Sequence, residues 1–545
     1  MRRESGVSDR QAATTIAWTT AKRAVRSGAV WGALFGVLVL NEALSYHKSF
    51  PTVASREKFA QAFGGNAGLT AIVGAGRRLD TIGGFVAWRM FGLLIIVGAI
   101  WGLLTAARLL RREEDTGRWE LLLAGRTTRR HATGQAIGGL AAGWAVLWAL
   151  TAALTAIAGL RASVGFPVSA SLFYATAVTA SAAMFLAVGA LASQLTPTRR
   201  QANGLAAAVF GLAFLIRMVA DGVTGLAWLR WVSPLGWVEN LHPLTGSAPL
   251  ALLPIILLTA VTGGAAVILA GRRDLGAAVL ARRRPADAST RLLGSPAGLV
   301  IQLERWAALA WISGLAILAA IFGVVAQSAA SGNVGVKAIE QQVSRLGGHP
   351  GGATTAWIGY EFLYLAALVA FAAAAQISGV RGEEADGYLD NLLARHLNRG
   401  TWLAGRLGFG VALVLAAGLA TGLGGWIGVT ARHGSIGFAA MMQAGLNVAV
   451  PALFILGLGT LLYALLPRLA VPILYTVILW SFLIEIIGST ITSNHWLLDT
   501  AVLSHLGPVP ATSLNWTAIA WLTGLALIAA LAGFTAFRHR DLAAA

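Results

Sequence analysis

Long apolar segments recur along the whole chain, and they limit its fold more than any other feature. Runs of 18 or more mostly apolar residues are each long enough to cross the roughly 30 Å hydrocarbon core of a bilayer as a helix. Only 12% of the residues are charged, whereas soluble domains carry about 25%. Because backbone polar groups in lipid must be satisfied within the segment, and strand-like alternation is absent, the sequence predicts an all-α polytopic membrane protein.

About twelve transmembrane helices are expected, six in each half. The first half is predicted to span the membrane at 28–46, 82–108, 134–160, 168–195, 203–227 and 248–271, and the second at 304–328, 354–380, 404–429, 437–465, 471–489 and 515–537. The basic N-terminus followed by an apolar run could also be a signal peptide. We interpret 28–46 as a retained span, because the run is longer than a signal-peptide core and no convincing cleavage site follows it.

Two segments of the chain resemble each other at a distance of 270 positions. Residues 111–130 read RREEDTGRWELLLAGRTTRR, and residues 381–400 read RGEEADGYLDNLLARHLNRG. Because twice 270 nearly equals the full length of 545 residues, the sequence predicts a tandem duplication. We expect a first half at 1–271, a cytoplasmic linker and connecting helix at 272–303, and a second half at 304–545, the halves being related by a pseudo-two-fold axis.

The distribution of basic residues predicts the orientation in the membrane. With the N-terminus inside, the inner segments hold 29 lysines and arginines and the outer segments hold 10. This asymmetry favours cytoplasmic termini and an even number of spans. The preference for arginine over lysine, with much Ala and Gly, indicates a bacterial source, so we expect a multi-pass protein of the bacterial plasma membrane. The net charge of +18 is explained by contact with anionic lipid, so no nucleic-acid partner is expected.

Motifs for catalysis are missing. The chain has no cysteine, its nine histidines are scattered, and it contains no G-x-x-x-x-G-K-[ST] phosphate loop, G-x-S-x-G or H-E-x-x-H motif. We therefore expect no catalytic residue, metal site or cofactor in this chain, and movement across a membrane rather than covalent chemistry.

Two further segments have mixed apolar and polar character. Residues 10–27 are predicted to form an amphipathic helix on the inner surface before the first span, and 297–306 are predicted to do the same before the seventh. The loop 228–247 carries three tryptophans and two prolines and is predicted to be a broken helix at the outer leaflet. An ordinary interfacial belt of aromatic residues explains the same composition.

The repeated acidic segments are the first candidate site. The residues that define them are Glu113, Glu114, Gly117, Glu120, Leu121 and Leu122 in the first copy and Glu383, Glu384, Gly387, Asp390 and Leu392 in the second. On one helix, spacing of i, i+4 and i+7 places the acidic residues and the glycine on one stripe. Such a helix suits docking to a basic groove. The glycine can instead mark a break before a short surface helix, and a solvated loop is the alternative to docking.

The pattern E-E-x-x-G-x-x-E-L-L-L-A-G, from Glu113 to Gly125, resembles that of ATP-binding-cassette exporter permeases. More narrowly, the whole chain is similar to the fused permeases of the polyketide-antibiotic (tetronasin-type) and multidrug efflux group. The second copy departs from the pattern at Asp390, Asn391 and Arg395, which predicts two docking sites of unequal strength.

This resemblance implies a transport subunit without its own nucleotide site. Two copies of a separate ATPase would bind ATP and Mg²⁺ and dock on the inner loops after the second span of each half. The exported compound would be hydrophobic or amphipathic and drug-like. The loop between the fifth and sixth spans would form re-entrant helices outside.

Charged residues within spans are the second candidate site, because charges are costly in lipid. The residues are Arg89, Arg217, Asp221, Glu361 and Glu485. Opposite signs in matching spans predict the pairs Arg89–Glu361 and Arg217–Glu485 across the pseudo-two-fold axis. Local neutralisation of Arg217 by Asp221, or snorkelling to an interface, is the alternative.

Two other functions fit the composition. A proton-coupled 6+6 drug transporter has the same span count and would use Asp221, Glu361 or Glu485 to carry the proton. A membrane sensor or scaffold is the third class, although no soluble signalling domain is visible in the sequence.

Overall fold

A computed structural model describes residues 2–63, 70, 74–115, 117, 127–223, 225–272, 295–331, 353–394, 397–491 and 498–540. Every regular element in these ranges is helical, which confirms the predicted all-α class. Eleven helices within them are long and apolar enough to cross a membrane, and Ala470–Glu485 is a shorter apolar helix at the position of the predicted eleventh span. The contacts divide the chain into two units, Met1–Ala286 and Asp287–Ala545.

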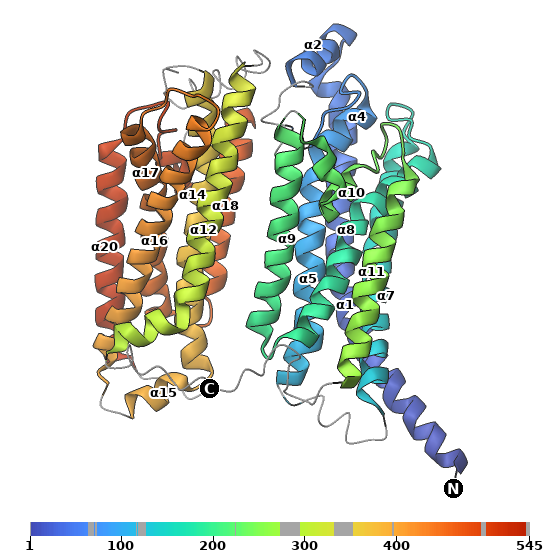
Figure 1. Ribbon diagram of the computed structural model, residues 1–545, viewed down its shortest axis with the longest axis horizontal. Helices are drawn as coiled ribbons and strands as arrows, with labels where there is room; N and C mark the ends of the chain where they lie inside the picture. Colours follow the sequence, from blue (N-terminus) through green and yellow to red (C-terminus); the bar gives the residue numbers. More distant parts are fainter. Residues whose placement is uncertain are drawn as a thin grey trace. The chain divides into compact units, whose positions relative to one another are not determined.

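The long helices of the first unit run alongside one another (Figure 1). They are α1 (Arg2–Ser49), α5 (Gly92–Asp115), α7 (Arg129–Gly159), α8 (Val168–Leu195), α9 (Arg199–Gly222) and α11 (Leu252–Arg272). Short elements connect them: α2 (Val53–Phe63), α4 (Ile82–Val86), the π-helical turn η1 (Ala87–Phe91), the 3₁₀ turns η2 (Ala227–Trp231) and η3 (Pro249–Ala251), and α10 (Pro234–Glu239).

The second unit contains α12 (Pro296–Ser331), α14 (Ala353–Ala385), α15 (Tyr388–Leu393), α16 (Arg399–Thr430), α17 (Phe438–Leu465), α18 (Ala470–Ile491), η5 (Leu503–His505) and α20 (Trp516–His539). Helices α14 and α17 form the interior of this unit. In the most apolar 18-residue stretch of each, 67% of the residues are buried, whereas in that of α20 only 17% are. In the first unit α8 holds the central position, with 83% buried, because its many Ala, Ser and Thr residues allow neighbours to approach on several sides.

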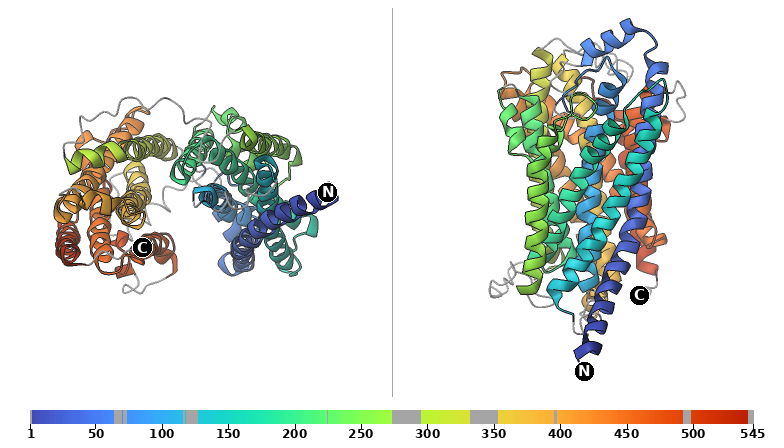
Figure 2. Two further views of the ribbon diagram at one scale, coloured as in Figure 1. Left: turned by 90° about the horizontal axis from the view of Figure 1, so that it is seen from below. Right: turned by 90° about the vertical axis from the view of Figure 1, so that its right-hand side faces the viewer.

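Close packing of α1 on α7 depends on glycines. A Cβ at Gly28 would lie 2.2 Å from the carbonyl oxygen of Gly143, and one at Gly139 would lie 2.8 Å from that of Ala17. The two helices run side by side (Figure 2). In the second unit, a Cβ at Gly428 would lie 1.9 Å from the carbonyl oxygen of Ala320, so α12 and α16 also need glycine at their contact.

Two sequence predictions need correction at helix ends. Residues 10–27 do not form a separate surface helix but belong to α1, which continues through Gly28 because that glycine packs on Gly143 of α7. The predicted span 203–227 is α9, which ends at Gly222.

The predicted break in 228–247 is present as two short helices, η2 and α10. The first turns of α12 lie at an angle to the rest of that helix (Figure 1).

Candidate functional site: the acidic loops and the buried ion pairs

The second acidic segment folds as a helix end, a turn and a short helix. Helix α14 ends at Ala385, Gly387 has φ +72°, and α15 follows from Tyr388. The amide of Gly387 donates to the carbonyl oxygen of Glu384 at 3.1 Å. Because a left-handed residue interrupts the helix, Glu383, Gly387 and Asp390 do not form one helical stripe. The alternative interpretation, in which the glycine breaks the helix, is correct for this copy.

Glu384 anchors this turn to the end of the last helix. Its carboxylate forms an ion pair with Arg540, which follows α20, and accepts a hydrogen bond from the Tyr463 hydroxyl of α17 at 2.5 Å. Arg540 also donates to the carbonyl oxygen of Tyr463 at 2.7 Å. The side chains of Glu384 and Arg540 are only 14% and 16% exposed. The ion pair therefore fixes the end of α14 against α17 and the C-terminal end of α20.

Glu383 makes a second anchor. It pairs with Arg406 of α16, and Arg406 also lies 3.6 Å from a carboxylate oxygen of Glu304 in α12. The Arg406 side chain is 4% exposed. One buried guanidinium thus joins two carboxylates from different helices, which ties the beginning of α12 and of α16 to the acidic segment.

Several side chains of α15 face away from the protein interior. Tyr388 is 62% exposed, and Asp390 and Asn391 are exposed, whereas Leu389 is buried and holds the short helix down. Leu392 is half-buried. In this copy the paired glutamates therefore position the loop, and the exposed polar face of α15 is available for contact.

The first acidic segment shows the same turn. Gly117 has φ +71°, and its amide donates to the carbonyl oxygen of Glu114 at 3.0 Å. Glu114 pairs with Arg111 at 3.1 Å, and Arg111 donates to the carbonyl oxygen of Pro197 between α8 and α9. The side chain of Glu113 and residues Glu120, Leu121 and Leu122 lie outside the described part of the chain.

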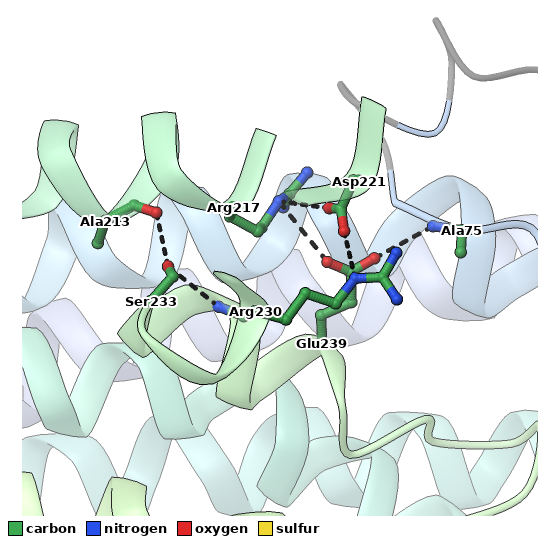
Figure 3. A network of polar contacts seen from close by, with 8 residues as sticks. Ala75, Ala213, Arg217, Asp221, Arg230, Ser233 and Glu239 are labelled. Atoms are coloured by element: carbon green, nitrogen blue, oxygen red, sulfur yellow. Dashed lines mark hydrogen bonds and ion pairs between the residues drawn. The ribbon is translucent and has the colours of Figure 1, made fainter. Parts of the chain in front are cut away.

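Arg217 lies in a four-residue ion network with Asp221, Arg230 and Glu239 (Figure 3). Its Nε is 3.3 Å from Asp221 and 3.7 Å from Glu239, and Arg230 lies 2.5 Å from Asp221. The backbone amide of Ala75 donates to Glu239 at 3.1 Å. The network joins α9, η2, α10 and the segment before α4, so local neutralisation of Arg217 is present within its own unit.

The electrostatics of Glu239 fit this arrangement. Burial raises the pKa of its carboxyl group, but the guanidinium groups of Arg217 and Arg230 and the amide of Ala75 act in the other direction, and its pKa lies below the ordinary value of 4.5. The adjoining cavity, which Arg77 and His242 also line, measures ≈ 40 Å³. That volume accommodates water but not a drug-sized compound, and the ion network fixes α9, η2 and α10 to one another.

The other intramembrane charges have different surroundings. Arg89 forms an ion pair with Glu42 of α1 at 2.9 Å, with the Arg89 side chain 52% exposed. Glu361 is fully buried in α14, and neither carboxyl oxygen has a hydrogen-bond partner among the described residues. Glu485 of α18 is half-buried and lies within electrostatic range of the hydrogen-bonded hydroxyls of Tyr360 and Tyr364. The pairs Arg89–Glu361 and Arg217–Glu485 would join different units and stay predictions.

The sequence did not reveal the cationic partners of the acidic loops. Arg111 is three positions before Glu114, so helical spacing could have found that pair. Arg540 is 156 positions from Glu384, and no local pattern connects them. Among the described residues, no group of three or more His, Cys, Asp or Glu side chains could hold a metal ion.

The fold is that of a polytopic helical membrane protein, and ion pairs hold both acidic segments to neighbouring residues. The sequence model of the family described as "ABC-2 family transporter protein" matches residues 14–326, more than half of the chain, and the chain belongs to this family. A permease of this family is a membrane subunit whose ATPase activity lies in a separate subunit. The predicted resemblance to ATP-binding-cassette permeases is thereby confirmed.

A particular relative extends the match into the second unit. The family model described as "Multidrug efflux system permease Rv1217c, C-terminal domain" matches residues 293–538. The chain is 29% identical over 470 residues to the "Multidrug efflux system permease protein Rv1217c" of Mycobacterium tuberculosis (strain ATCC 25618 / H37Rv), which covers 85% of this chain and 83% of the relative.

Proposed function

We propose that this chain is the permease of an ABC-2 multidrug exporter that moves hydrophobic or amphipathic, drug-like compounds out of the cell. The observation that carries the proposal is the similarity to a multidrug efflux permease along 85% of the chain. Membership of the ABC-2 family favours an ATP-driven transporter over the proton-coupled alternative. Export of a polyketide antibiotic is a narrower proposal that rests on the sequence resemblance alone.

In this proposal two ATPase copies, each with ATP and Mg²⁺, dock on the two acidic loops, and both chain termini are cytoplasmic. The exposed face of α15, with Tyr388 and Asp390, would receive one copy, and the segment after Gly117 would receive the other. Buried anchors support this role, because a loop that transmits force must be fixed to the helices that it moves. The anchors at Glu383 and Glu384 tie the end of α14, which leads through Gly387 into α15, to α12, α16, α17 and the residue after α20.

The two halves are proposed to be related by a pseudo-two-fold axis. Equal left-handed turns at Gly117 and Gly387, 270 positions apart, support this symmetry. The cross-half pairs Arg89–Glu361 and Arg217–Glu485 would then line the translocation path. A double charge swap of one pair should restore export that each single reversal abolishes, and no restoration would refute that pairing.

The test is ATP hydrolysis by the purified complex with a co-expressed candidate ATPase. The variant Tyr388→Ala/Asp390→Arg changes only exposed α15 side chains and spares both anchors. We expect it to lose copurification of the ATPase or drug-stimulated hydrolysis. The control Glu57→Arg reverses an exposed carboxylate on α2 and should behave as wild type. Unchanged assembly and stimulation in the α15 variant would reject docking there, and failure of the wild type to recruit any ATPase would reject the function.

A further inference from the structure

Helices α14 and α18 of the second unit carry two carboxyl and two hydroxyl groups within their membrane-spanning parts. The Tyr364 hydroxyl donates a hydrogen bond to the Tyr360 hydroxyl at 2.8 Å. Glu361 and Glu485 both lie within electrostatic range of the Tyr364 hydroxyl. The four groups therefore belong to one polar site inside this unit.

Ring contacts fix how the two helices lie against each other. The ring centroids of Tyr364 and Phe482 are 5.5 Å apart, and those of Phe371 and Tyr475 are 5.7 Å apart. Seven positions forward on α14 thus correspond to seven positions back on α18, so the two helices run antiparallel in a defined register.

This register puts both carboxyl groups at one level, because Glu361 lies three positions before Tyr364 and Glu485 lies three positions after Phe482. Glu361 is fully buried, and neither of its carboxyl oxygens has a hydrogen-bond partner among the described residues. Glu485, Tyr360, Tyr364 and Phe482 are half-buried. The site therefore has a buried end at Glu361 and an accessible end at Glu485.

Among the described residues, the basic side chains of the helices that pack on α14 lie far from these carboxyls or have another partner. Helices α17 and α18 contain no Lys, Arg or His, and the one basic residue of α14, Arg381, lies about 30 Å along the helix from Glu361. The basic residues of α12 and α16 lie within the first ten residues of each helix, at the end that meets Glu383. In η5, Nδ1 of His505 lies 2.9 Å from the carbonyl oxygen of Ala501.

We propose that this site binds the charged group of a lipophilic organic cation, of the ammonium or phosphonium type, among the compounds that the chain exports. The inference rests on the proposed transport function and narrows its substrate class. A carboxylate beside aromatic rings is the arrangement that recognises organic cations. A cation beside Glu485 would also offset the cost of a charge within the membrane. A lipophilic anion does not fit, because it would meet two carboxyl groups at this level.

The predicted cross-half partners, Arg89 and Arg217, are the other source of positive charge for these carboxyls. Both guanidinium groups already pair with a carboxylate of their own unit, at 2.9 and 3.3 Å. A ligand cation would compete with a cross-half arginine for the same carboxyl, so removal of either arginine distinguishes the two sources.

The experiment measures equilibrium binding of radiolabelled tetraphenylphosphonium, a lipophilic cation, to the purified full chain in detergent, with tetraphenylborate as an anion of similar shape. Glu485→Gln removes the charge at the accessible end and should weaken tetraphenylphosphonium binding about tenfold or more. Phe482→Leu removes a ring of the site and should weaken binding about two- to fivefold. Tyr475→Leu is the matched control, because it removes a ring of the same helix about 15 Å along the axis from Glu485.

A second carboxyl variant, Glu361→Gln, tests the buried end. It should weaken tetraphenylphosphonium binding without lowering the thermal midpoint, because it removes a buried carboxyl that has no partner among the described residues. A lower midpoint with unchanged binding would show that Glu361 serves the fold and not the ligand.

The proposal expects saturable binding of tetraphenylphosphonium by wild type and by Tyr475→Leu, and loss of it in Glu485→Gln. Equal binding of the cation and the anion, or unchanged binding in Glu485→Gln, would overturn it. Binding that appears only in Arg89→Gln or Arg217→Gln would assign the positive charge to the first half and would also overturn it. Because the measurement needs no ATPase, a failure here leaves the permease function standing, and a failure to recruit an ATPase leaves this result unaffected.

Discussion

The anchor between Glu384 and Arg540 makes a quantitative prediction about the second acidic loop. The substitution Glu384→Gln keeps the size of the side chain and a hydrogen-bond acceptor but removes the charge opposite a guanidinium. Hydrogen bonds to charged groups contribute about 1.5–3 kcal/mol. Because both side chains are mostly buried but not fully, at 14% and 16% exposed, we expect a cost of about 2 kcal/mol for opening the loop.

Amide hydrogen exchange over residues 386–394 measures this opening directly. The amides of Asp386, Gly387 and Ala394 are hydrogen-bonded within the turn and α15, so their exchange reports release of the loop. A loss of about 2 kcal/mol corresponds to exchange about 30-fold faster. The control Asp390→Asn changes an exposed carboxylate on the same helix, and its exchange should differ from wild type by no more than about twofold.

A double-mutant cycle gives the outcome that would refute the reasoning. If Glu384 and Arg540 act as a pair, Arg540→Gln in the Glu384→Gln background should add much less than it does alone. Additive effects, or unchanged exchange in Glu384→Gln, would show that the ion pair does not hold the loop.

Three further predictions follow from the same structure. Gly387→Ala should cost about 1 kcal/mol, because φ is +72° there, and Gly387→Asn should cost less; exchange of the following helix measures both. Arg217→Gln should lower stability by about 1.5–3 kcal/mol, because Asp221 and Glu239 lose one of the two guanidinium groups near them and keep Arg230. The thermal midpoint in detergent measures this change, and a shift no larger than that of an exposed arginine would contradict it. Burial and Arg77 lower the pKa of His242 from 6.5, so the folded state binds fewer protons than the unfolded state below that pH. Stability should therefore fall as the pH drops below about 6.5, and this residue can contribute at most about 1.4 kcal/mol per pH unit. A pH series of thermal midpoints measures the dependence of stability on pH. That dependence should be weaker in His242→Gln.

Hydrophobic periodicity and length predicted most of the fold. Apolar runs such as 168–195 and 437–465 coincide with α8 and α17 within one residue at each end, because Pro167 and Pro197 flank the first helix and Gly437 and Pro467 flank the second. The end of α9 was less predictable. Arg217 and Asp221 neutralise each other in the last turn of α9, and the chain then leaves the helix at Gly222 rather than at residue 227.

The acidic repeat was visible in the sequence, but which of its acidic residues form ion pairs and which stay exposed was not. Spacing alone placed Glu383, Gly387 and Asp390 on one stripe, because helical periodicity carries no information about a left-handed residue within it. The structure turns the chain at Gly387, so that Glu383 faces Arg406 while Asp390 stays exposed.

The sequence by itself determined that the chain is helical, membrane-embedded and duplicated in its acidic segments, because hydropathy, length and repetition are properties of neighbouring residues. Only the tertiary structure decided which charges are anchors and which are surface. Arg540 reaches Glu384 across 156 positions, and Glu239 reaches Ala75 across 164. Contacts at such separations depend on how the helices pack. Packing in turn depends on where a glycine lets a neighbouring backbone approach closely.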